Sequence, residues 1–197
     1  RGAGATLTVL NGEYLAKSNK SACNIMVASE TVDVDVQGGF FKAVSNNSIA
    51  ACIFTNASKG RNFSFKGCVM QAYNNIQTFN ENSSVAAVRI QSHKNGKVIF
   101  ESGTYAGYSY SCLAPGVYIG SKSGYNSEVE IRGGNFYGVT SVIGLNAGTC
   151  NRTCGLWATA VDALKITGGK FSGTITGALL YPQTMITGGD YEGGVHG

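Results

Sequence analysis

The stretches VEIRGGNFYG (residues 129–138) and LKITGGKFSG (residues 164–173) share one pattern, and this pattern decides the fold. An apolar residue and one further residue precede a glycine pair. An aromatic residue stands two positions after the glycines, and a small residue closes the segment. Working outward along the 197 residues, the pattern occurs seven times, as TVLNGEYLA (8–16), DVQGGFFKA (35–43), SFKGCVMQA (64–72), IFESGTYAG (99–107), EIRGGNFYG (130–138), KITGGKFSG (165–173) and MITGGDYEG (185–193). A recurrence at this interval is typical of a solenoid or another repeat architecture.

Equivalent positions of the repeat form two columns. The aromatic column consists of Tyr14, Phe41, Met70, Tyr105, Phe136, Phe171 and Tyr191. The apolar column consists of Val9, Val36, Phe65, Phe100, Ile131, Ile166 and Ile186. A further short apolar run precedes each of the last six patterns, as CNIMVAS (23–29), AACIFTN (50–56), AAVRIQS (86–92), PGVYIGS (115–121), CGLWATA (154–160) and GALLYPQ (177–183). One repeat therefore contains two or three short strands separated by turns.

The strands are predicted from alternation of apolar and polar residues. In TVDVDVQ (31–37) the valines face one side, and Asp33 and Asp35 face the other, which indicates a half-buried strand. The segment 156–164 contains good helix formers, but it falls on the strand–turn–strand register of its neighbours, so we interpret it as strand. A unit of about 30 residues cannot bury its own apolar face, so successive units must stack with equivalent strands paired in parallel.

A β-propeller or a β-sandwich is the structural alternative. Both need antiparallel hairpins with Asn-Gly or Asp-Gly turns at even spacing. The pairs Asn11-Gly12 and Asn95-Gly96 do not fit such a plan. The glycines of the repeat instead suit a bend between two faces of a coil.

The phrases VEIRGGNFYG and LKITGGKFSG resemble the coils of the pectate-lyase-like superfamily. This resemblance implies an all-β fold, a right-handed single-stranded parallel β-helix of about seven coils, forming one domain over residues 1–197. The superfamily includes polysaccharide lyases and hydrolases, bacteriophage tailspikes and surface adhesins. Its NTD, DD and GHG motifs, and the DPHD motif of alginate epimerases, are absent from this sequence.

The composition excludes several classes of protein. With 43% hydrophobic and 13% charged residues, the chain is not a disordered polyelectrolyte. Its 28 glycines have no three-residue period and there are only 2 prolines, which excludes collagen. No apolar stretch approaches the length of a membrane span. The 15 Lys and Arg are scattered against 11 Asp and Glu, so the net charge of +4 does not predict a nucleic-acid partner.

The six cysteines are Cys23, Cys52, Cys68, Cys112, Cys150 and Cys154. We expect an oxidising compartment and disulfides, with the loop CNRTC (150–154) closed on itself or linked to Cys112; buried free thiols are the alternative. Because there is no CxxC motif and only two histidines, we expect no metal site and no cofactor. N-glycosylation sequons point to a secreted glycoprotein and occur at Asn19, Asn46, Asn56, Asn62, Asn82 and Asn151.

Acidic residues on the outer face of the coil are the candidates for catalysis. If the chain is an enzyme, its catalytic carboxylates are Asp33, Asp35, Glu101, Glu128 and Glu130. Asp33 and Asp35 are expected to lie about 6–7 Å apart on one face, which suits an inverting glycosidase pair or a calcium site. A surface ion ladder, with Glu101 between Lys66 and Arg132 on neighbouring coils, is the simpler interpretation.

Exposed tyrosines are the candidates for binding. Tyr108, Tyr110 and Tyr137 fall at outward or loop positions, where a flat apolar ring with a polar tip suits contact with a glycan. Arg132 is the charged candidate at such a surface. Ordinary local packing of loop tyrosines is the alternative for each of them.

The leading functional hypothesis is a structural or adhesive β-solenoid, located extracellularly or on a virion surface. Such a fibre, spike or adhesin module would display loops such as 72–86 and 107–115 for contact with a glycan or a partner. The chain begins and ends on predicted ladder strands without a capping segment, which predicts a fragment or an assembly subunit whose partners are its own copies, head to tail or in a trimer, or neighbouring structural proteins. A polysaccharide-degrading enzyme of the tailspike type and a self-assembling filament subunit are the alternatives.

Overall fold

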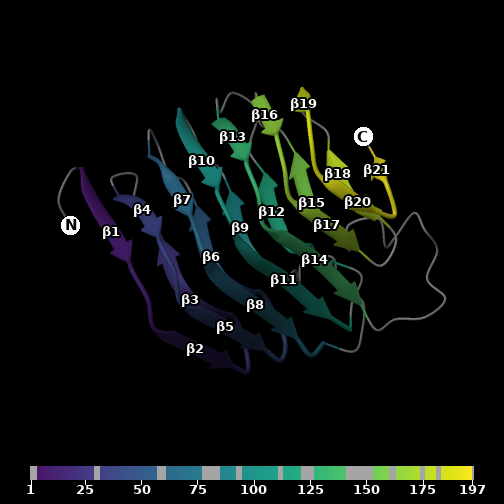
Figure 1. The fold of residues 1–197 in the computed structure, drawn as a ribbon. Coiled ribbons are helices and arrows are strands. Elements are labelled where there is room, and N and C mark those ends of the chain that lie inside the picture. The colour runs from purple at the N-terminus through teal and green to yellow at the C-terminus, as the bar shows by residue number, and fades with distance from the viewer. Residues whose placement is uncertain are drawn as a thin grey trace.

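The computed structural model forms three parallel β-sheets that wind around one axis as a β-solenoid (Figure 1). It describes residues 4–28, 32–56, 61–76, 85–91, 95–110, 113–120, 127–140, 153–159, 163–173, 176–180 and 183–196. Within these ranges all regular structure is β-strand and no helix occurs. The parallel β-solenoid predicted from the repeat is therefore confirmed.

Each sheet contains seven strands, and each repeat contributes its strands in the order A, B, C. Sheet A consists of β1 (Ala5–Val9), β4 (Val32–Val36), β7 (Phe63–Phe65), β10 (Gly96–Phe100), β13 (Ser127–Ile131), β16 (Ala163–Ile166) and β19 (Thr184–Ile186). Sheet B consists of β2 (Glu13–Ser18), β5 (Phe40–Ser45), β8 (Cys68–Asn74), β11 (Gly103–Ser109), β14 (Asn135–Thr140), β17 (Lys170–Gly173) and β20 (Asp190–Glu192). Sheet C consists of β3 (Ala22–Val27), β6 (Ala50–Asn56), β9 (Val85–Gln91), β12 (Val117–Gly120), β15 (Cys154–Thr159), β18 (Thr176–Leu180) and β21 (Val195–His196).

The strand register places equivalent residues of the repeats above one another. In sheet B, Tyr14 pairs with Phe41, and this column continues through every coil to Tyr191. In sheet A, Val9 pairs with Val36, and the apolar column continues to Ile186. Both predicted columns are confirmed without a slip. The segment interpreted as strand rather than helix lies in β15 and β16, apart from residues 160–162, which are not described.

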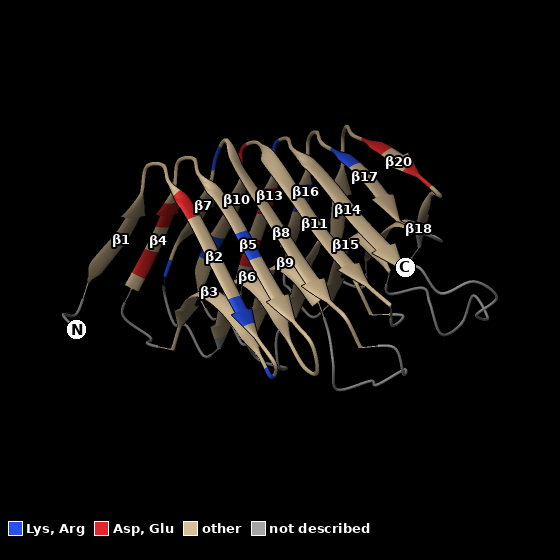
Figure 2. Cartoon of the chain, turned by 90° about the horizontal axis from the view of Figure 1, so that it is seen from below, with Lys and Arg blue, Asp and Glu red and all other residues tan. Residues whose placement is uncertain are grey.

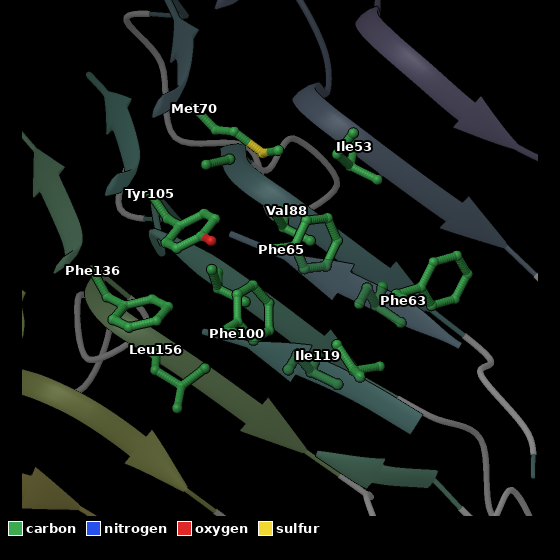
Figure 3. Close-up of a cluster of buried hydrophobic side chains, with 14 of the residues drawn as sticks. Ile53, Phe63, Phe65, Met70, Val88, Phe100, Tyr105, Ile119, Phe136 and Leu156 are labelled. Atoms are coloured by element: carbon green, nitrogen blue, oxygen red, sulfur yellow. The ribbon is translucent and has the colours of Figure 1, made fainter. Parts of the chain in front are cut away.

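The interior of the coil is filled by the inward columns of the three sheets (Figure 3). Phe136 and Tyr105 stack with ring centroids 5.0 Å apart, and Phe136 and Phe171 stack at 4.8 Å. Phe100, from the apolar column of sheet A, meets Tyr105 edge-on at 5.1 Å. All four side chains are fully buried. Aromatic pairs in these geometries stabilise a core beyond the burial of their area.

Glycines shape the corner between sheets A and B. Gly134 has φ +113°, a region that residues with a Cβ rarely adopt. Gly133, directly before it, lies so close to the coil before that an added Cβ would stand 2.8 Å from the carbonyl oxygen of Glu101. The glycine pair of the repeat therefore supplies both the bend and the close approach of successive corners.

The expected disulfide framework is wrong for the cysteines in the first three coils, because Cys23, Cys52 and Cys68 are free thiols. The register places Cys23 opposite Ala51 rather than opposite Cys52. Burial raises the pKa of Cys23 to about 11 and also raises the pKa of Cys52 and Cys68. Such thiols behave as small apolar side chains. Cys112 and Cys150 lie outside the described residues.

The aromatic stack predicts a large stability effect at its centre. We expect Phe136→Ala to lower the free energy of unfolding by about 3–5 kcal/mol, because it removes a fully buried ring from between two stacked neighbours. Urea unfolding followed by circular dichroism measures the change. Leu15→Ala, at an exposed position of the same sheet, is the control and should change the value by less than about 0.5 kcal/mol. Equal effects of the two substitutions would contradict the stacked core.

Candidate functional site

The two acidic candidates of β4, Asp33 and Asp35, accept hydrogen bonds from residues of the next coil. The Asp33 carboxylate accepts a hydrogen bond from the backbone N–H of Asn62 at 2.8 Å. The Asp35 carboxylate accepts hydrogen bonds from the hydroxyl of Ser64 and from the side-chain amide of Gln37. Both carboxylates therefore hold β7 in register with β4, and the structure shows no cation paired with either of them among the described residues.

The other acidic candidates lie farther along the same outer face, in an ion cluster. The Arg132 guanidinium contacts Glu101 on the preceding coil and lies 2.9 Å from a Glu130 oxygen. The Lys97 ammonium lies 3.0 Å from the same Glu130 oxygen. Arg132, predicted as a binding residue, is thus paired with two carboxylates of its own chain. Glu128 lies on β13 beside Glu130 and is exposed.

The ion cluster determines what chemistry Glu130 can perform. Its two cationic partners, Arg132 first and Lys97 second, lower the pKa of the Glu130 carboxyl to about 2. A general acid in glycoside hydrolysis needs a raised pKa, so that it still carries its proton near neutral pH. Glu130 is therefore set up as a permanent carboxylate that links neighbouring coils.

The tyrosine candidates come together on the outer face of sheet B. Tyr108 of β11 stacks on Tyr73 of β8 with ring centroids 4.6 Å apart and planes 12° from parallel. The Lys42 ammonium lies 4.9 Å from the centre of the Tyr73 ring, a cation–π contact. Tyr110 follows β11 directly and is exposed. Figure 2 shows this face, on which the central strands β8, β11 and β14 carry no charged residue.

These tyrosines line a cavity of about 230 Å³. We call it the tyrosine pocket, and its lining residues are Tyr73, Asn74, Asn75, Tyr108, Ser109, Tyr110 and Val139. The volume is below the roughly 300–1,000 Å³ of pockets for drug-sized ligands, so it suits a single ring of sugar size. The two stacked rings and Val139 supply apolar surface for such a ring.

The polar groups at the tyrosine pocket fall into two sets. The Asn74 side chain is held in place, because its amide donates to the Ser48 carbonyl and its oxygen accepts from the N–H of Ile76. The hydroxyls of Tyr108 and Tyr110 make no hydrogen bond to any described residue. The pocket therefore combines a flat apolar wall with hydroxyl groups that are available to a ligand.

Sequence reasoning identified Tyr108 and Tyr110 but not Tyr73. Alignment of the repeats would have identified Tyr73, because Tyr73 and Tyr108 are register partners in the same outward column of sheet B. Tyr137, the third tyrosine candidate, lies in a neighbouring outward column, opposite Ala106 and Ser172. The structure does not bring it into the tyrosine pocket.

Three of the six sequons can be placed with their side chains. Asn46 donates its amide to the side-chain oxygen of Asn19 at 2.8 Å, and Asn75 donates to Asn46 at 3.0 Å, which makes a short asparagine ladder. The Asn62 side-chain oxygen accepts from the N–H of Lys97. Asn56 ends β6, and Asn82 and Asn151 lie outside the described residues. Asn19 and Asn62 are exposed and keep the amide nitrogen, which a glycan would modify, out of hydrogen bonds to described residues.

Comparison with known proteins assigns no role to these surfaces. No family model, no characterised protein and no solved structure matches the chain. Within the described ranges, no group of three or more His, Cys, Asp or Glu side chains is arranged to hold a metal ion. The same ranges contain no helix of the length and hydropathy needed to cross a bilayer. What the fold defines is a parallel β-solenoid in which the central strands β8, β11 and β14 of sheet B carry tyrosines and no charged residue.

The ion cluster predicts a pH dependence of stability. The pKa of Glu130 in the folded protein, about 2, lies below the ordinary value of about 4.3. The contribution of Glu130 to the free energy of unfolding is therefore complete above about pH 5 and is lost as the pH falls toward 2. We expect Glu130→Gln to lower the free energy of unfolding at pH 7 by about 1 kcal/mol or less, because solvent screens the ion pairs of Glu130. The variant should also lose less stability than the unchanged protein between about pH 5 and pH 2. Urea midpoints measured at several pH values test this.

Glu128→Gln is the matched control, because Glu128 lies on the same strand and has no ion pair with a described residue. It should leave the acid profile close to that of the unchanged protein. Profiles that cannot be told apart for the two variants would show that the Glu130 ion pairs do not contribute to stability.

Proposed function

We propose that this chain is a non-enzymatic β-solenoid module that binds glycans through the tyrosine pocket of sheet B. The observation that carries the proposal is the Tyr73–Tyr108 stack, with the unengaged hydroxyls of Tyr108 and Tyr110 at the edge of the same cavity. Sugar rings offer an apolar face of C–H groups and a rim of hydroxyls. A tyrosine wall with a polar edge complements both parts.

Rigidity supports binding of this kind. Tyr73 and Tyr108 are fixed by their strands, which pair in register along their whole length. A ring stacked on a neighbouring ring loses little freedom when a ligand covers it, so less of the interaction energy is lost to ordering. The solenoid thus acts as a frame that holds the pocket in its binding geometry.

The setting of the module belongs to the same proposal. The likeness of the repeats to pectate-lyase-like coils favours a fibre, spike or adhesin, acting outside the cell or on a virion surface. Assembly with further copies or with neighbouring structural proteins would present many tyrosine pockets at once. Weak glycan contacts would then gain affinity through multivalency.

The tyrosine pocket predicts a specific loss of binding. We expect Tyr108→Ala to weaken binding of the glycans selected from an array by about tenfold, because it removes one wall of the pocket and a hydroxyl. Isothermal titration calorimetry with the selected oligosaccharide measures the change. Tyr137→Ala is the matched control, since it removes the same side chain from a neighbouring outward column of sheet B.

The proposal would be contradicted if the two variants lost equal glycan affinity, or if the unchanged protein bound to no glycan on the array. The enzymatic alternative is tested on the same glycans by measuring newly formed reducing ends. Their appearance, and their loss in the Asp33→Asn, Asp35→Asn double variant, would replace binding by cleavage as the function.

A further inference from the structure

Sheet C carries a second outward column of a different chemical kind. The register aligns the middle residue of each apolar run from coil to coil, so that Met26, Phe54, Arg89, Tyr118 and Trp157 lie in one row. Their neighbours along the strands, such as Val88 and Ile90 beside Arg89, point inward and are fully buried. We call the row from Phe54 to Trp157 the arginine–aromatic ladder.

Arg89 lies between aromatic rings in this ladder. Its guanidinium carbon is 5.9 Å from the centre of the Phe54 ring and 5.1 Å from that of Tyr118. The ring of Trp157 continues the ladder 4.6 Å beyond Tyr118. The Nε atom of Arg89 is buried, and it has no hydrogen-bond partner among the described residues.

No described carboxylate is within ion-pair distance of this guanidinium. Burial lowers the pKa of Arg89, although the group stays charged at neutral pH. A half-buried cation without an anion is unfavourable for folding, and an apolar side chain would fill the same row without that penalty. Among the described residues, the ladder therefore contains a cation without a balancing anion.

We propose that the arginine–aromatic ladder is a second binding site, which takes a carboxylate-bearing saccharide. The planar guanidinium donates two parallel hydrogen bonds to the carboxylate, and the rings of Tyr118 and Trp157, which follow Arg89 in the ladder, support the adjacent sugar rings. A neutral glycan would leave the cation uncompensated. The ladder differs from the tyrosine pocket in sheet and in charge, so this inference is independent of the function proposed for sheet B.

Charge and shape decide among anionic ligands. A nucleic acid carries a phosphate at every residue, and its affinity comes from many basic contacts, whereas Arg89 is the single Lys or Arg among the described strands of sheet C. An acidic peptide could supply a carboxylate, but it has no repeated flat rings to cover the aromatic side chains. A saccharide acid satisfies both parts of the ladder.

Trp157 allows this site to be observed separately, because it is the single tryptophan of the chain. We expect alginate oligosaccharides to change its fluorescence in a saturable titration, and dextran oligosaccharides of equal length to leave it unchanged. Arg89→Met should weaken alginate binding about tenfold or more, through loss of the charge-assisted pair, while the melting temperature is unchanged or higher. Arg89→Lys should bind with intermediate affinity, since it keeps the charge without the planar fork.

Two matched variants separate this result from other causes. Lys66→Met removes an equal charge from an exposed position outside sheet C and should change alginate affinity less than twofold. Tyr108→Ala, which disables the tyrosine pocket, should leave it unchanged as well. The inference is overturned by any of three results: no saturable response to alginate, an equal loss in Lys66→Met, or a poly-glutamate affinity as high as that for alginate, which would indicate a protein partner instead.

Discussion

The structure depends on the in-register stacking of parallel strands from coil to coil. Strands that pair in this way lie about 4.8 Å apart, so every side chain must fit directly above its counterpart. The separations of the stacked rings, from 4.6 Å for Tyr14 and Phe41 to 5.0 Å for Tyr105 and Phe136, match this spacing. Columns of similar residues follow from the geometry, because a flat ring is best covered by another flat ring at this distance.

The same spacing governs the charges on the outer faces, since like charges directly above one another would repel at close range. Sheet A avoids this arrangement at each charged position. Asp35 lies opposite Ser64, Glu130 lies opposite Lys165, and Glu101 is paired with Arg132 of the next coil. Four of the five acidic residues that suggested catalysis, all except Glu128, thus contact a residue of a neighbouring coil. The uncharged strands of sheet B have no such constraint, which leaves their tyrosines free to form a pocket.

Sequence alone predicted the interior well, because repeated apolar residues report directly on the columns that fill it. It predicted the outer faces only in part. Tyr108 was identified one residue at a time, whereas its partner Tyr73 follows from register. The residues Phe54, Arg89 and Tyr118 were noticed only as members of apolar runs, and aligning IFT, VRI and VYI by their middle letter would have shown the ladder. The disulfides were expected from a count of cysteines, which contains no information on whether two of them face each other.

The outward arginines of sheets A and C have different neighbours: Arg132 contacts carboxylates, whereas Arg89 contacts aromatic rings. Arg132 has Glu101 one coil away and Glu130 two residues away, so its charge is balanced within the chain. Phe54 and Tyr118 are the register partners of Arg89 on the two neighbouring coils. A glutamate at either position would be one coil away from Arg89, as Glu101 is from Arg132, and would balance its charge. Stacking geometry therefore does not force the aromatic neighbours on Arg89. Among the described residues, the ladder has rings where sheet A has carboxylates, and the proposed recognition of an external carboxylate rests on this difference.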